Sequence, residues 1–408
     1  MERTELSLGL KRNTLRLTSI PELPRSSIVL CSDIEGPWFI GDFVDVAMSE
    51  KCKPKNGAIE AIPTYGHLIY QEIWRYFTET TKLYRRNSES QKPRDPNLIS
   101  LSQEGTDTIF TLPLLLASGA TYDYLEKLTL VSQCTPGSKE MVKALQDQGV
   151  IIFGITTAPQ EPYRTLVNQT DFLDPKQVIG SPFPLEETRE LLNSNDWWGN
   201  QEISIVTGYL NDCYQIIDEN SRLTLKDGTL IRDLSEKGRQ VLTSRCARFL
   251  NTELGISYDP FVRRSRKLAR TILGQVIEEV GVVGDRAKAA LALSAYMCHG
   301  SKDGCLVTMG DGPNDAEMLR KAHMSIGING ADAAKAAKIA VVTDNVQNTL
   351  PIFEQIIAGE RNPDVIVQRA NEKVGTAAII CRGGPDISEE VLREHRLMKQ
   401  KLRGDIIY

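Results

Sequence analysis

Short apolar runs, each ending at a small or acidic residue, alternate with helical patterns along the chain. The first run, IVLCS, ends at Asp33, and the second, GVIIFGITTAP, begins at Gly149. A third segment, residues 304–343, alternates short apolar runs with helical spacing twice more. Such alternation is typical of a parallel sheet covered on both faces, so we predict an α/β, Rossmann-like fold. In these sheets ligands bind outside the carboxyl ends of the strands, where the polar strand ends would meet.

The pattern also predicts where individual elements begin and end. In the third segment we expect strands at 306–309, 324–328 and 340–343, and helices at 316–322 and 331–337. Before the second run, three apolar residues share one helical face, and we expect Ser138 to cap that helix and Gly149 to close it.

Segments between the strands set the predicted domain organisation, because they contain helix-like sequence without the apolar runs that predict strands. We interpret the first as an inserted, mainly helical cap and the second as a further insertion. The predicted division is an N-terminal arm (1–26), core parts 1, 2 and 3 (27–40, 131–184 and 271–360), the cap (41–130), the second insertion (185–270) and a C-terminal strand and helix (361–408).

Two features of the second insertion have both an ordinary and a functional interpretation. A basic run at residues 263–270 fits a solvated helix face better than an anion-binding site. Trp197 and Trp198 either pack the insertion or line a pocket or partner surface. We therefore assign no chemistry to either feature.

Composition and charge narrow the functional class. With 41% hydrophobic and 25% charged residues and a formal net charge of -5, the chain has no general attraction for nucleic acid or an anionic membrane. Its eight cysteines contain no C-x-x-C pair and its four histidines no spaced pair, so we predict free thiols and no zinc or iron-sulfur site. Because no apolar run is long enough to span a bilayer or form a secretory signal, we expect a cytoplasmic protein.

Carboxylates at two expected strand ends carry the candidate chemistry. Asp33 follows the first strand, and Asp311 and Asp315 lie in the loop GDGPNDAEML. Asp and Gly also favour turns and helix caps, but two carboxylates four residues apart can face one ion when a helix begins inside the loop. Mg²⁺ takes oxygen ligands, and an Asp held beside it can attack phosphorus to form an aspartyl-phosphate. The sequence therefore predicts a magnesium-dependent phosphoryl-transfer site.

Two further groups complete the predicted site. Thr156 or Thr157, at the end of the second strand, offers a hydroxyl to a phosphate oxygen, although threonine is also an ordinary strand residue. Lys288 in GDRAKAALAL offers a cation that balances Asp33 and the phosphate, with Arg286 as its rival and a solvated helix lysine as the structural alternative.

The order of these motifs resembles the haloacid dehalogenase superfamily, whose members are mostly phosphatases. The shared features are D-x-E, an apolar run ending in Thr, a Lys and G-D-G-x-N-D-x-x-M-L, within residues 27–343 and outside the two insertions. A narrower similarity, in DIEGP, IGSPFPLEE, GDRAK and LRGDIIY, is to an archaeal group named for energy-converting hydrogenase A subunit R. The superfamily resemblance implies these roles: nucleophile, Asp33; metal ligand through its backbone carbonyl, Glu35; phosphate hydroxyl, Thr156 with Thr157 as alternative; phosphate-binding cation, Lys288; magnesium ligands, Asp311 and Asp315.

Glu35 departs from the pattern of the resembling phosphatases, which have Asp two residues after the nucleophile. That second carboxylate normally protonates the leaving oxygen and then activates water. Glu35 carries the same group on one more methylene, and a displacement of about 1 Å can cost about 100-fold in rate. Two functions therefore stay open: a magnesium-dependent phosphatase acting on a small phosphorylated metabolite, and a weakly active or non-catalytic accessory protein that binds a protein partner.

Overall fold

The computed structural model describes residues 20–88, 103–256 and 271–403. Its residues fall into two compact units. The insertion unit lies within Phe43–Leu125 and Pro182–Val282, and the core unit lies within Thr18–Asp42, Glu126–Ser181 and Val283–Tyr408. Most of both predicted insertions belongs to the insertion unit, which also takes residues 271–282. The finer division drawn from the sequence stays a proposal.

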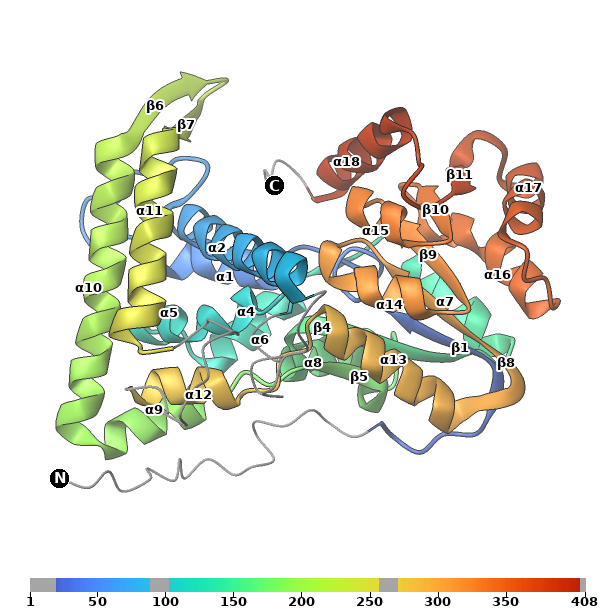
Figure 1. The fold of residues 1–408 in the computed structure, drawn as a ribbon, viewed down its shortest axis with the longest axis horizontal. Coiled ribbons are helices and arrows are strands. Elements are labelled where there is room, and N and C mark those ends of the chain that lie inside the picture. Colours follow the sequence, from blue (N-terminus) through green and yellow to red (C-terminus); the bar gives the residue numbers. More distant parts are fainter. Residues whose placement is uncertain (1–19, 89–102, 257–270, 404–408) are drawn as a thin grey trace. The chain divides into compact units, whose positions relative to one another are not determined.

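A seven-stranded sheet forms the centre of the core unit (Figure 1), with the strand order β11-β10-β9-β8-β1-β4-β5. Neighbouring strands are parallel except β10 and β11. The strands are β1 (Ser26–Ser32), β4 (Ile151–Pro159), β5 (Val178–Ser181), β8 (Gly300–Gly310), β9 (Met324–Ile328), β10 (Ile339–Val342) and β11 (Ile379–Arg382). Their apolar side chains are almost entirely buried, as expected for a sheet covered on both faces. The predicted α/β, Rossmann-like fold class is confirmed.

Helices connect the strands of this sheet, and the expected elements agree closely with the observed ones. Only β8 differs much, because it begins six residues before the predicted start at 306. The core-unit helices are α7 (Ser138–Asp147), α8 (Gln160–Gln169), α13 (Asp285–His299), α14 (Ala316–Lys321), α15 (Ala331–Ala336), α16 (Leu350–Ile357), α17 (Pro363–Val374) and α18 (Glu389–Arg403). A short pair, β2 (Phe39–Ile40) and β3 (Gln133–Cys134), lies outside the large sheet.

The ends of α7 test the predicted caps. Gly149 adopts a φ of 76° two residues beyond the last helical residue, and its N–H donates to the Gln146 carbonyl, so it closes the helix as predicted. Ser138 is the first residue of the helix rather than its cap, which is Gly137. The prediction for Ser138 is wrong because its hydroxyl donates instead to the Trp38 carbonyl, at 3.0 Å.

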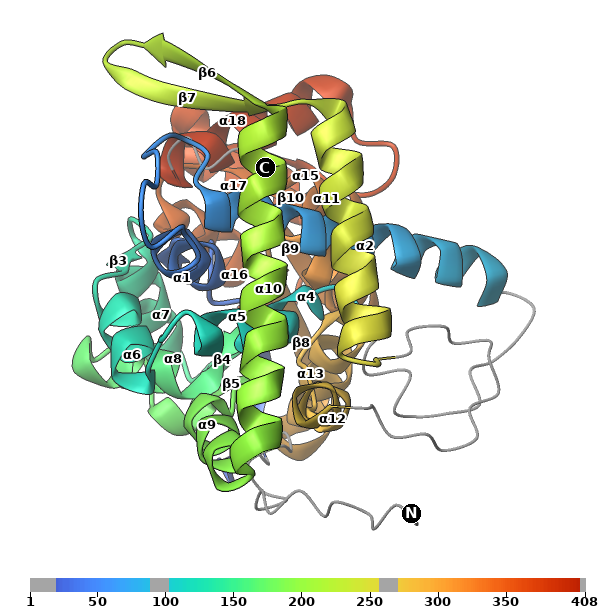
Figure 2. The same cartoon turned by 90° about the vertical axis from the view of Figure 1, so that its left-hand side faces the viewer.

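The insertion unit is mainly helical. Figure 2 shows α10 and α11 side by side, joined through the hairpin β6–β7, which the sequence did not predict. Trp197 and Trp198 are 61% and 64% exposed, so they do not pack its interior, and the basic run at 263–270 lies outside the described residues. The elements are α1 (Phe43–Lys51), α2 (Tyr65–Ser88), α4 (Asp107–Phe110), α5 (Leu112–Ala117), α9 (Leu185–Ser194), α10 (Asp196–Asn220), β6 (Ser221–Lys226), β7 (Thr229–Leu234), α11 (Glu236–Arg248), a π-helical turn (Phe249–Glu253) and α12 (Ile272–Glu279). The remaining helix, α6 (Tyr122–Leu130), contains the point where the chain passes between the units.

Among the described helices, none combines the length and the apolar character that crossing a bilayer would require.

Candidate functional site

Asp33 lies at the carboxyl end of β1, in the interior of the sheet. Its backbone N–H donates to the Met309 carbonyl of the neighbouring β8 at 2.9 Å, which continues the strand pairing through this residue. The side chain is buried, and its Oδ1 accepts from the Ile34 N–H at 2.8 Å. Since β1 lies between β4 and β8, the ends of all three parallel strands meet around Asp33.

The acidic loop after β8 folds around the Asp315 side chain. Asp315 Oδ2 accepts from the N–H groups of Asp311 and Gly312, each at 3.0 Å. A Cβ atom at Gly310 would lie 2.5 Å from Asp315 Cγ, so the strand end needs glycine for the carboxylate to fit. The loop thereby fixes the position of the Asp315 carboxylate.

Three buried carboxylates converge at these strand ends, and we call Asp33, Asp311 and Asp315 the acidic cluster. Each offers an oxygen, and these oxygens lie within 4.8 Å of one another. Lys288, on the first turn of α13, is fully buried beside them. Its Nζ lies 2.9 Å from Asp33 Oδ1 and 2.8 Å from Asp315 Oδ1. The structure therefore brings together four of the residues that the sequence singled out.

Burial and charge act against each other in this cluster. Burial, reinforced by Asp315, raises the pKa of Asp33 well above its usual value, although Lys288 opposes the rise. Burial alone would lower the pKa of Lys288, but Asp315 and Asp33 outweigh it and raise that pKa. For Asp311, burial is outweighed by the cations Lys399 and Arg403, which lower its pKa. An ionised Asp33 would thus be stabilised by further positive charge.

The two threonines of β4 differ in their contacts. Thr157 Oγ1 accepts from Asn314 Nδ2 of the acidic loop at 2.9 Å and donates to the Val283 carbonyl at 2.9 Å. Thr156 Oγ1 instead accepts from the Ala158 N–H at 3.1 Å, within its own strand. Of the two candidates, Thr157 is the one hydrogen-bonded to the loop that carries the carboxylates. Asn314 lies inside the quoted motif, but sequence reasoning gave it no role.

Glu35 has a partner that the sequence did not suggest. The hydroxyl of Tyr163, on α8, donates to Glu35 Oε1 at 2.6 Å. Tyr163 is only 2% exposed, and burial, followed by the Glu35 charge, raises its pKa far above the usual value. The carboxyl group of Glu35 is thus held by a rigid aromatic side chain.

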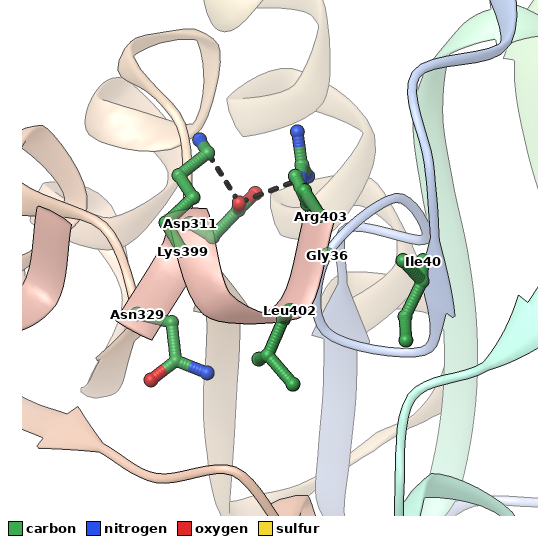
Figure 3. A pocket seen from close by; sticks show the side chains of 7 residues that line it. All are labelled: Gly36, Ile40, Asp311, Asn329, Lys399, Leu402 and Arg403. Atoms are coloured by element: carbon green, nitrogen blue, oxygen red, sulfur yellow. Dashed lines mark hydrogen bonds and ion pairs between the residues drawn. The ribbon is translucent and has the colours of Figure 1, made fainter. Parts of the chain in front are cut away.

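The last helix of the core unit also reaches the acidic cluster. Figure 3 shows Lys399 and Arg403 of α18 directed at the Asp311 carboxylate. Lys399 Nζ lies 3.1 Å and Arg403 Nη2 3.0 Å from the same atom, Asp311 Oδ2. We call Lys399 and Arg403 the α18 cation pair. A small pocket beside the pair is lined by Gly36, Ile40, Asp311, Asn329, Lys399, Leu402 and Arg403.

Comparison with known proteins supports the fold. No family model and no curated protein matches the chain. Among solved structures, it is similar to gene product AF1437 from Archaeoglobus fulgidus, with a TM-score of 0.60 and 17% identity over 93% of this chain and 97% of that one. This similarity shows a shared α/β fold.

Two phosphoserine phosphatase structures also align, one a phospho-aspartyl intermediate analogue and one with substrate bound. Each has a TM-score of 0.35 and 13% identity, and the alignments cover 80% and 81% of this chain and 98% of each phosphatase. Nothing in these comparisons supports the narrower similarity to the hydrogenase-named group.

Proposed function

We propose that the protein is a magnesium-dependent phosphatase of the haloacid dehalogenase type, which hydrolyses a small phosphomonoester through an aspartyl-phosphate. The observation that carries the proposal is the buried acidic cluster with Lys288 between two of its members, 2.9 and 2.8 Å from their oxygens. Structural ion pairs rarely gather three buried carboxylates at one point inside a protein, because burying each charge is costly.

The acidic cluster fits a magnesium ion. Its donors are carboxylate oxygens, which this hard cation prefers, and their mutual spacing lets one ion contact all three residues. Burial, and then Asp315, raise the pKa of Asp33, so further positive charge beside it would favour its ionised form. When bound, the ion would tie Asp33, Asp311 and Asp315 to a phosphate oxygen and offset their charge.

The residues of the site have complementary roles in the proposed reaction. Lys288 and the Ile34 N–H both bind Asp33 Oδ1, so we assign the attack on phosphorus to Oδ2. A phosphorus–oxygen bond to Asp33 forms as the bond to the leaving group breaks, and Glu35 gives its proton to the leaving oxygen. A water molecule then attacks the phosphorus of the aspartyl-phosphate, Glu35 accepts a proton from that water, and the bond from phosphorus to Asp33 breaks. Lys288 binds a phosphate oxygen, and the Thr157 hydroxyl does so after its proton turns away from the Val283 carbonyl.

The accessory-protein alternative also has an observation in its favour. Asp311, one of the three carboxylates assigned to the metal, is already paired with two cations of the same chain. A protein that keeps this pairing permanently would retain the fold with little turnover. We therefore test the two functions in one experiment.

The test measures phosphate release from a panel of small phosphomonoesters, with Mg²⁺ and with a chelator. We expect release only with Mg²⁺, and none from Asp33→Asn. A matched control, Asp147→Asn, changes an exposed aspartate on α7 and should retain full activity. Equal activity of Asp33→Asn and the wild type would refute the mechanism, and no release from any ester would favour the accessory protein.

A further inference from the structure

The α18 cation pair makes an unusual contact for a candidate metal ligand. Both groups bind the same oxygen, Asp311 Oδ2, and both Asp311 and Arg403 are largely inaccessible, with side-chain exposures of 5% and 9%. Lys399 and Arg403 are four residues apart and therefore face the same side of the helix. The contact involves the very carboxylate that the proposed function assigns to the metal.

Packing of α18 places this pair. Leu392, earlier on the same helix, is fully buried and packs with Ala334 of α15 and Ala340 of β10. The helix is therefore anchored to the core unit on one side of the sheet, and its last two turns extend to the acidic cluster. The position of Lys399 and Arg403 follows from this docking rather than from a chance surface contact.

A glycine in the nucleophile's own turn accommodates one member of the pair, Arg403. Gly36 has a φ of 101°, and a Cβ atom there would lie 2.7 Å from Arg403 Nη2 and 2.5 Å from Asp311 Cγ. Any larger residue would push the guanidinium away from the carboxylate. The turn that follows Asp33 is thus shaped to admit Arg403 beside Asp311.

Two cations of the chain already contact the Asp311 carboxylate. The three carboxylates of the acidic cluster face three cations, Lys288 and the α18 cation pair. A divalent cation that approached Asp311 would meet two positive charges already in contact with that carboxylate. In a buried setting such repulsion is large, so the ion and the pair cannot both be held equally well.

We propose that the α18 cation pair competes with the divalent metal for Asp311, so that metal binding requires Lys399 and Arg403 to withdraw from that carboxylate. This proposal rests on the proposed function, because it concerns the same metal site. It makes α18 a regulator of the site: with the helix end in place, the metal binds weakly, and with the metal bound, the last turn of the helix is released.

Magnesium titration by calorimetry of the full chain tests this proposal without any phosphatase assay. We expect the double variant Lys399→Gln/Arg403→Gln to bind Mg²⁺ at least about tenfold more tightly than the wild type, because two repelling charges are removed. Lys401→Gln is the matched control, since Lys401 lies on the same turn but pairs with Asp344 at 2.8 Å. It should bind Mg²⁺ within about twofold of the wild type.

Hydrogen exchange gives a second readout. We expect Mg²⁺ to speed amide exchange in the last turn of α18 of the wild type and to leave the first turn unchanged. Equal or weaker Mg²⁺ binding by the double variant would overturn the proposal and make the pair a support for Asp311. Absence of Mg²⁺ binding in both proteins would overturn it as well. Tighter binding in a protein that releases no phosphate would support the competition while refuting the phosphatase.

Discussion

Replacing Lys288 with methionine removes the ammonium group that bridges two members of the acidic cluster and nearly preserves the length of the side chain. Lys288 is fully buried, with Nζ 2.9 Å from Asp33 Oδ1 and 2.8 Å from Asp315 Oδ1. The variant leaves two buried carboxylates without their shared counter-charge. We therefore expect a large loss of stability in the core unit, although the methionine fills the space.

The size of the loss follows from the cost of breaking a buried ion pair. Removing one partner typically costs about 3–5 kcal/mol, because the remaining charge stays buried. That is a large part of the free energy of unfolding of a domain, about 5–15 kcal/mol. With a urea m-value of about 3 kcal/mol/M, the unfolding midpoint should fall by roughly 1–1.7 M.

The loss should also depend on pH. Lys288 opposes the raised pKa of Asp33, so its removal raises that pKa further. When the pKa of an acid is higher in the folded than in the unfolded state, the free energy of unfolding of the protein falls as the pH rises. The fall begins at the unfolded pKa, about 3.9 for Asp, and continues up to the folded pKa. Lys288 itself has a raised pKa and stays charged at neutral pH in the wild type. The deficit of Lys288→Met should therefore be smaller at pH 5 than at pH 8.

Urea unfolding followed by circular dichroism and tryptophan fluorescence at both pH values measures these effects. Lys321→Met serves as the control, because Lys321 is an exposed lysine of α14, and it should unfold within about 0.5 kcal/mol of the wild type. A deficit for Lys288→Met below about 1 kcal/mol, or one that does not change with pH, would refute the electrostatic account of the cluster.

Three substitutions at neighbouring positions have equally definite outcomes. Asp33→Asn removes a carboxylate whose pKa is raised by burial, so the metal-free variant at pH 7 should unfold at the same urea concentration as the wild type or a higher one. It should also lose phosphate release. A lower urea midpoint would contradict this reasoning. Tyr163→Phe removes a hydrogen bond to a carboxylate, worth about 1.5–3 kcal/mol, so kcat should fall about 10-fold or more with little change in KM. In a Glu35→Asp background the same change should have no further effect, and an equal loss in both backgrounds would exclude a role through Glu35. Gly36→Ala adds a Cβ atom beside Asp311 at a residue with positive φ. The control is Gly41→Ala, because Gly41 also has a positive φ but open space around it, and Gly36→Ala should destabilise the protein by more than about 1 kcal/mol beyond this control. Equal urea midpoints of the two variants would rule out the clash.

The sheet and its chemistry were predictable for a common reason. A strand that is buried on both faces has a continuous apolar sequence, and a parallel sheet brings the carboxyl ends of such strands to the same side. The positions of Asp33 and the acidic loop, each directly after a predicted strand, were therefore enough to predict that they lie close together. The hairpin β6–β7 lacks such an apolar run, because β6 is exposed along most of its length. Its two-residue turn, Asp227-Gly228, is a hairpin signal that the search for apolar runs passed over.

Side-chain partners were less predictable, because tertiary contacts decide among residues of the same type. Ser138 had the composition of a helix cap, yet a carbonyl one hundred positions earlier takes its hydroxyl. Thr156 and Thr157 are identical in local pattern, and their hydrogen-bond partners in the folded chain distinguish them. In the sequence, Lys399 and Arg403 look like basic residues of an ordinary terminal helix. Only the packing of that helix against the core unit brings them to Asp311.

Glu35 shows why a resemblance in sequence cannot replace the structure at this site. Compared with the usual aspartate, its extra methylene moves the carboxyl group farther from the backbone, which by itself argues for a misplaced acid. In the structure that carboxyl group accepts a 2.6 Å hydrogen bond from Tyr163, whose ring is buried in the core unit. Because a buried tyrosine has few alternative positions, the longer arm is restrained at its end rather than left free. The two positions have to be interpreted together: Glu35 accepts a hydrogen bond from the hydroxyl of Tyr163, so its difference from the aspartate of the resembling phosphatases is matched by a contact. That difference is therefore not in itself evidence against the proposed function.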